Sequence, residues 1–218
     1  MKTYIKKFFY FPVFLPFLLA ACINNEPKEP YIYEKNPQYT WGYAVFYGDY
    51  YAEYGNENNV LSISLFTNGL GINENNYLIG TGQYLYLEDI FVTPTDTLLP
   101  DGIYTIDKSG ESFTISPGEH LSIDGVIYTV GATITYLDIY LLNPVEKLIT
   151  EGTMNVSRQD TIYTISCNFK TDDNLELKGN FTGILPHFDQ SLKKNSESLR
   201  MLRHTKRSFI LSRLNSSK

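Results

Sequence analysis

The chain has 218 residues, of which 43% are hydrophobic and 15% aromatic, and a formal net charge of −6. That charge is unevenly spread. Residues 23–190 carry 7 basic and 23 acidic side chains, a net charge of −16, whereas residues 191–218 carry 8 basic and 1 acidic, a net charge of +7. So acidic a central region excludes nucleic acid as the expected partner, and it repels anionic lipid headgroups, so membrane attachment would need an anchor.

Residues 1–21 have the pattern of a secretory leader. Three lysines precede an apolar run from Phe8 to Leu19, and the run ends in Leu-Ala-Ala-Cys with the cysteine at position 22. Two prolines interrupt the run, and it is shorter than the roughly 20 apolar residues of a transmembrane helix. We therefore predict a cleaved signal peptide rather than a membrane span.

This segment resembles the signal peptide of a Gram-negative lipoprotein, in which the thiol of the cysteine is acylated and becomes the first residue of the mature chain. The resemblance implies lipidation at Cys22, and more than one acyl chain gives a stable membrane anchor. Because residue 23 is isoleucine rather than aspartate, we expect the outer membrane, on either its periplasmic or its outer face. An ordinary secretory signal followed by a chance cysteine is the alternative.

Residues 22–39 are predicted to be the lipid anchor and a tether. This stretch contains three prolines and several charged residues, and X-Pro steps favour an extended backbone. Such a composition supplies few residues for a core, so we expect the folded domain to begin at residue 40.

Residues 40–188 are predicted to form an all-β domain, because strand-like alternation recurs between clusters of turn residues. Leucine and isoleucine alternate with serine over 61–65, and leucine alternates with tyrosine over 84–87. The run 132–142 is apolar on both faces, as in a central strand. Residues 161–170 and 175–185 form the clearest hairpin. We predict about nine or ten strands, arranged as an antiparallel β-sandwich or a calycin-like barrel.

Cys167 is the only cysteine besides Cys22, so no disulfide within the mature chain is expected. It alternates with Tyr163, Ile165 and Phe169 on one face of the predicted strand, which favours a buried structural cysteine over a nucleophile.

Residues 189–218 differ in kind from the rest of the chain. Leu199, Leu202 and Phe209 roughly share a helical face among many basic residues. A basic amphipathic helix is one expectation, with contact to anionic lipid or to the protein's own acidic domain. The other is a poorly ordered extension.

Catalytic and metal-binding motifs are missing from the sequence. The three histidines are scattered, and there is no metal-ligand spacing, nucleophile elbow or phosphate loop. We therefore expect neither enzyme activity nor a metal or other cofactor. Glu88, Asp89 and Asp138 lie within apolar strands and leave a carboxylate-pair hydrolase as an alternative, although acids in such positions commonly face solvent or a strand edge.

Tyrosine is concentrated between residues 31 and 54, where eight tyrosines accompany Trp41 and Phe46. Aromatic rings present a flat apolar face, and tyrosine adds a polar tip, so such rings can stack on sugars. The candidate ligand-binding residues are Trp41, Tyr43, Tyr47, Tyr50 and Tyr51. An aromatic first strand that packs one face inward is the alternative.

The lipobox, the stretch Tyr-Gly-Asp-Tyr-Tyr (47–51), Leu-Pro-Asp-Gly-Ile-Tyr-Thr (99–105) and Gly-Asn-Phe-Thr-Gly (179–183) are together similar to the small all-β lipoproteins of gut Gram-negative bacteria. That family implies outer-membrane association and no established activity. We expect a non-enzymatic binding or adhesion module for a glycan or an envelope protein. A lipocalin-like barrel that binds an apolar ligand is the alternative.

Overall fold

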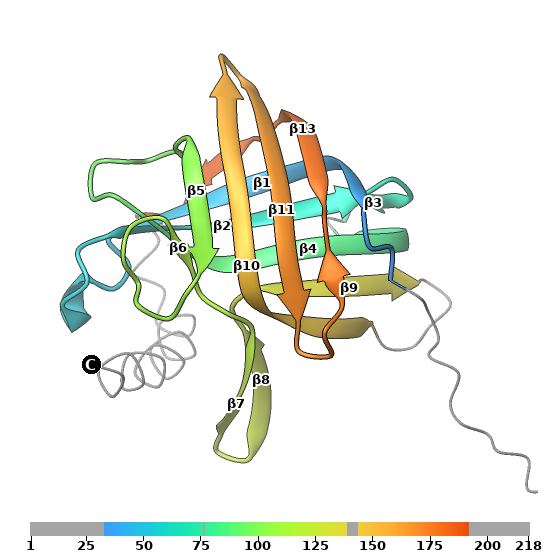
Figure 1. Ribbon diagram of the computed structural model, residues 1–218, viewed down its shortest axis with the longest axis horizontal. Helices are drawn as coiled ribbons and strands as arrows, with labels where there is room; N and C mark the ends of the chain where they lie inside the picture. Colours follow the sequence, from blue (N-terminus) through green and yellow to red (C-terminus); the bar gives the residue numbers. More distant parts are fainter. Residues whose placement is uncertain (1–32, 76, 139–143, 192–218) are drawn as a thin grey trace, which may run out of the picture. The chain divides into compact units, whose positions relative to one another are not determined.

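A computed structural model describes residues 33–75, 77–138 and 144–191 (Figure 1). The predicted leader, Cys22 and nearly all of the basic tail lie outside the described residues. The described chain is all-β, as predicted, and of the two architectures expected it has the barrel. Within the described ranges, no helix is long and apolar enough to cross a membrane.

The described part contains fourteen strands and one 3-10 helix. In chain order these are β1 (Gln38–Gly48), η1 (Ala52–Tyr54), β2 (Asn59–Thr67), β3 (Leu70–Ile72), β4 (Leu78–Val92), β5 (Gly102–Ile106), β6 (Thr114–Ile115), β7 (Glu119–Ile123), β8 (Val126–Val130), β9 (Thr133–Asp138), β10 (Val145–Gln159), β11 (Ile162–Thr171), β12 (Glu176–Leu177), β13 (Asn180–Ile184) and β14 (His187–Asp189).

The barrel closes between strands at opposite ends of the sequence. The path β1-β2-β4-β6-β5-β10-β11-β13 returns to its start because β13 pairs with β1 in parallel, through Gln38 with Asn180 and Tyr39 with Phe181. Figure 1 shows β10, β11 and β13 running across β1, β2 and β4 on the opposite side of the barrel. The predicted hairpin of 161–170 and 175–185 is confirmed as β11 with β12 and β13.

The two longest strands, β4 and β10, each change partner midway. Residues 81–86 of β4 and 145–148 of β10 both pair with β9, so β9 is the central strand expected from its two-sided apolar sequence. Farther along, β4 pairs with β6 and β10 pairs with β5. The hairpin β7-β8 follows β6 and precedes β9 in the chain, and it extends away from the barrel (Figure 1).

The barrel interior is filled by large apolar side chains. Because neighbouring strands are in register, alternate residues point to the same face of the sheet, and one face of a closed barrel points inward. Residues of this set are 5% exposed or less: Leu61, Ile63, Leu65, Leu85, Leu87, Ile134, Met154, Val156, Ile165, Cys167 and Phe181. Cys167 is therefore the buried structural cysteine that was predicted, and burial raises the pKa of its thiol.

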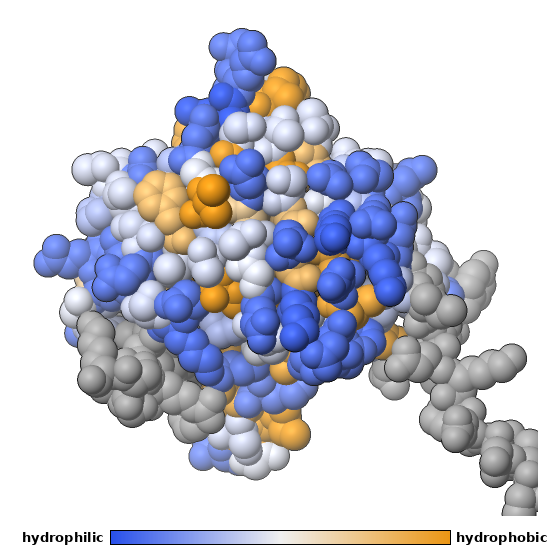
Figure 2. Space-filling model, in the orientation of Figure 1, coloured by the Kyte–Doolittle hydropathy of each residue, from blue (hydrophilic) through white to orange (hydrophobic). Residues whose placement is uncertain are grey.

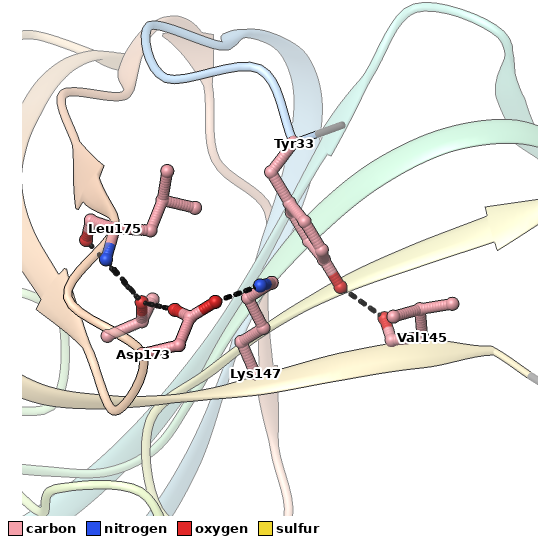
Figure 3. A network of polar contacts seen from close by, with 6 residues as sticks. Tyr33, Val145, Lys147, Asp173 and Leu175 are labelled. Atoms are coloured by element: carbon pink, nitrogen blue, oxygen red, sulfur yellow. Dashed lines mark hydrogen bonds and ion pairs between the residues drawn. The ribbon is translucent and has the colours of Figure 1, made fainter. Parts of the chain in front are cut away.

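One end of the barrel is covered by the segment just before β1. The hydroxyl of Tyr33 donates to the carbonyl of Val145 at 2.5 Å, and Glu34 exchanges backbone hydrogen bonds with the side-chain amide of Gln83. Figure 3 shows that Lys147 lies beside the Tyr33 ring, 5.1 Å from its centroid, and pairs with Asp173. Residues 33–39 were assigned to the tether from sequence, but Tyr33, Pro37 and Tyr39 are buried against the barrel.

The opposite end is held by the loop after β4 and by β14. The backbone amide of Leu99 donates to Nε2 of His187, while Nδ1 of His187 lies 2.8 Å from the carbonyl oxygen of Leu185. These two contacts require neutral imidazole with its proton on Nδ1. Burial lowers the pKa of His187, which favours that neutral form.

Candidate ligand-binding surface

The outer surface of the barrel has two different halves. On β10, β11 and β13 most outward positions are polar and exposed: Thr153, Asn155, Ser157, Thr164, Asn168, Asn180 and Thr182. The register partners Ile162 and Ile184 are exposed apolar residues on the same face. Figure 2 views the molecule from this side, where hydrophilic side chains predominate. On β1, β2 and β4 the outward positions instead carry aromatic rings and buried serines, which concentrates the aromatic candidates on one half of the barrel.

An aromatic row runs across β1, β2 and β4, composed of Trp41, Phe66 and Tyr84. The three residues are register partners on adjacent strands. The ring of Trp41 stacks on Phe66 with centroids 3.9 Å apart and an interplanar angle of 11°, and Tyr84 lies 5.6 Å from Phe66 on the other side. The indole N–H of Trp41 donates to the carbonyl of Leu70 at 2.9 Å. Phe66 is only 4% exposed, so its neighbours form the accessible part of the row.

Two further aromatic residues border this row. Tyr43 lies 6.0 Å from Phe66, and Phe188 of β14 meets Tyr43 edge-on at the same centroid separation. Phe188 is 54% exposed. Tyr43 and Trp41 are half-buried, so each keeps part of its ring on the surface.

Next to the aromatic row, small serine side chains on β2 lie between the aromatic side chains of β1 and β4. Ser64 lies between Tyr43 and Tyr86 in register, and Ser62 is 3.5 Å from the hydroxyl of Tyr47. The alternation of β2 predicted one apolar and one polar face, but all nine residues of the strand are buried, including both serines. Large tyrosines on the flanking strands account for part of this burial, because they extend beyond the short serine side chains.

A second group of rings, the tyrosine cluster, consists of Tyr47, Tyr50, Tyr51 and Tyr54. These residues pack on buried Val60 and Phe91 around the end of β1 and η1. Tyr51 is the innermost, with its ring 5.1 Å from Tyr50 and 5.7 Å from Phe91. The other three rings are half-buried.

Two carboxylates occupy an irregular part of β4 beside this cluster. The pairing of β2 with β4 shifts between Leu61 and Ile63, which places Glu88 and Asp89 within a bulge. Asp89 is 7% exposed and accepts a hydrogen bond from the hydroxyl of Tyr51 at 2.7 Å. Glu88 accepts one from the backbone amide of Gly131 at 2.8 Å. Burial, followed by the nearby Asp89 charge, raises the pKa of Tyr51 well above its usual value.

The sequence-predicted ligand residues are thus divided between two groups. Trp41 and Tyr43 belong to the aromatic row, whereas Tyr47, Tyr50 and Tyr51 belong to the tyrosine cluster. Tyr51 is 3% exposed and bonded to Asp89, so it supports the cluster from below instead of offering a ring to a ligand. Phe66, Tyr84 and Phe188 were not predicted. The alternation of tyrosine with leucine over 84–87 was the signal for Tyr84, since it places that ring outside the barrel.

The remaining candidates lie elsewhere. Asp138 contacts the hydroxyls of Thr81 and Tyr136. Its register partner Thr81 is seven residues from Glu88 along β4, or roughly 20 Å at strand spacing. Asp138 and the bulge carboxylates therefore do not form a pair. Among the described residues, no group of three or more His, Cys, Asp and Glu side chains is placed to hold a metal ion.

Comparisons of this chain with protein-family models, with curated proteins and with solved structures find no match.

Proposed function

We propose that the chain is a lipoprotein, anchored in the outer membrane through Cys22, whose barrel binds a glycan on the outer aromatic row. The observation that carries this proposal is the row itself. Trp41, Phe66 and Tyr84 are register partners on adjacent strands, and Tyr43 and Phe188 border them. The rings stack on one another across three paired strands, so they form a rigid apolar ridge in which Phe66 is covered and the exposed parts belong to Trp41, Tyr43 and Tyr84. A sugar ring can pack its C–H face against the exposed aromatic surface of such a ridge.

Polar groups beside the row supply the second requirement of sugar binding. Half-buried tyrosine hydroxyls at Tyr43 and Tyr84 can bond sugar hydroxyls, and the exposed part of the ring remains available for stacking. The described residues carry 6 basic and 21 acidic side chains, a balance that suits a neutral or cationic glycan better than an anionic one.

The test uses Trp41, the only tryptophan in the chain. A protein beginning at residue 23 is titrated with pooled plant polysaccharides and mucin glycans while Trp41 emission is followed. We expect a saturable shift, with the apparent affinity reduced at least about tenfold in Tyr43→Ala, a change of about 1.4 kcal/mol. Thr164→Ala on the polar half is the matched control and should bind as the parent does. A flat titration, or equal binding by Tyr43→Ala, would refute a glycan site on this row.

A second candidate, binding of an apolar ligand inside the barrel, is favoured by the closed eight-strand path. A barrel of this size either fills its interior with side chains or holds one small ligand. The buried leucines, isoleucines and phenylalanines of this chain fill space that such a ligand would need, which is why we place the ligand outside. Apolar material that co-purifies in native mass spectrometry would favour this second candidate.

A further inference from the structure

We propose that the basic segment 192–218 binds the tyrosine cluster of its own barrel, where the carboxylates of Asp49, Glu53 and Glu88 pair with its lysines and arginines. This interaction is separate from glycan binding on the aromatic row. It rests on where the chain leaves the barrel, on the distribution of charge and on the apolar character of both partners.

The chain leaves the barrel directly beside the cluster. In β14, Asp189 pairs with Phe46 of β1, and the amide of Gln190 donates to the carbonyl of Phe46 at 2.8 Å. Ser191 follows next to Gly48, since a Cβ added to Gly48 would lie 3.2 Å from the Cβ of Ser191. Asp49 and Tyr50 directly follow Gly48, the last residue of β1. Residue 192 is therefore delivered to the edge of the tyrosine cluster.

The charges of the two partners are opposite. Asp49 and Glu53 are exposed on the loop that holds the cluster, and Glu88, in the bulge of β4 beside it, is half-buried. None of the six basic residues of the described part lies on β1, η1, β2 or β4. Residues 192–218 carry eight lysines and arginines against one glutamate. Because the attachment at Ser191 keeps these charges close, their effective concentration at the cluster is high.

The apolar surfaces also correspond. Tyr47, Tyr50 and Tyr54 present half-buried rings over Val60 and Phe91. Leu199, Leu202 and Phe209 supply an apolar stripe in the basic segment if it forms the helix that its sequence predicts. Tyrosine rings additionally bind arginine and lysine through cation–π contacts. A helix of 27 residues is about 40 Å long. Because neighbouring strands are about 4.8 Å apart, such a helix is long enough to cross the strands that carry the tyrosine cluster.

The experiment measures access to a thiol introduced by Leu202→Cys in a protein beginning at residue 23. Cys167→Ala is present in every sample, because Cys167 is buried in the folded protein but would also react once urea exposes it. We expect the introduced thiol to react with a maleimide at least tenfold more slowly in the folded protein than in urea. Neutralising the loop with Asp49→Asn and Glu53→Gln should accelerate the reaction at least fivefold, as should 0.5 M NaCl, since salt screens such pairs.

Glu151→Gln with Glu176→Gln, two exposed acids on the polar half, is the matched control and should leave the rate unchanged. Unfolding midpoints of all variants establish that the fold is intact. A thiol that reacts as fast in the folded protein as in urea, or equally fast with and without the loop acids, would overturn the proposal. Protection that develops only when anionic vesicles of phosphatidylglycerol are added would also overturn it and would assign the segment to the membrane.

Discussion

The two halves of the barrel share one interior but differ in how they meet the surroundings. On β10, β11 and β13 buried apolar residues alternate with outward residues that are mostly polar and exposed, Ile162 and Ile184 being exposed apolar exceptions. On β1, β2 and β4 the outward positions are aromatic or small, and β2 is buried on both faces. The first pattern is that of a sheet with one solvated face. The second shows that residues outside a barrel can be as deeply packed as its core.

The largest effect on stability that would test this difference is expected for Phe66→Ala. Phe66 points outward yet is only 4% exposed and stacks between Trp41 and Tyr84. We expect the free energy of unfolding to fall by about 3–5 kcal/mol, as for a core phenylalanine. Asn168→Ala, at an exposed outward position of β11, should change it by less than about 0.5 kcal/mol. Urea unfolding measures both, and a loss below about 1 kcal/mol for Phe66→Ala would show that the row is ordinary surface.

The hydrogen bond between Tyr51 and Asp89 gives the next largest expected effect. Asp89→Asn should cost about 1–3 kcal/mol, because it weakens the acceptor of a buried hydroxyl. Asp160→Asn is the control, since Asp160 is exposed in a turn and asparagine tolerates its positive φ of 57°. The effect should largely disappear in a Tyr51→Phe background, where the donor is gone. An equal loss in both backgrounds would contradict this pairing.

Alkaline pH should lower the free energy of unfolding through Tyr51, on the same half of the barrel. Burial, and then Asp89, raise the pKa of Tyr51 above its usual value near 10. The stabilisation is therefore complete below pH 10 and is lost as the pH rises above 10, where the unfolded chain ionises first. One such tyrosine contributes a slope of at most about 1.4 kcal/mol per pH unit. Denaturant unfolding between pH 9 and 11 should show a shallower fall for Tyr51→Phe than for the parent, and an identical slope would disprove the effect.

The smallest expected effect lies on the polar half, at the ion pair of Lys170 with Glu151. Its charged atoms are 3.9 Å apart, and both side chains are well exposed. Such pairs contribute little because water and salt screen them. Glu151→Gln should therefore change the unfolding free energy by less than about 0.5 kcal/mol. A larger loss would mean that the polar half also depends on its outer side chains.

Local alternation was sufficient to predict the all-β class, the hairpin at the end of the domain and the burial of Cys167. It could not predict the burial of Ser62 and Ser64, because that depends on which tyrosines lie opposite them in β1 and β4. Register between strands distant in sequence is a long-range property. The same limit explains why Trp41 and Tyr43 were predicted without Phe66, Tyr84 and Phe188, which complete their row.

The start of the domain and the number of strands show two further limits of local patterns. Residues 33–39 have the composition of a linker, and only their contacts with Gln83, Val145 and residues 178–180 place them on the barrel. The expected last strand is divided into β12 and β13 near Gly179, where a side chain would lie 2.5 Å from the ring of Tyr39. Neither set of contacts can be predicted from the nearby sequence.

The segment before β1 also determines how the domain bears mechanical load. Any pull on the chain ahead of residue 33 reaches the barrel through Tyr33 on β10, through Glu34 on β4 and through the carbonyls of Lys35 and Pro37, which accept from Lys178 and Asn180. The force is thus shared among three separate parts of the wall before β1 is loaded. A domain held in this way resists peeling from its first strand when the chain ahead of residue 33 is pulled.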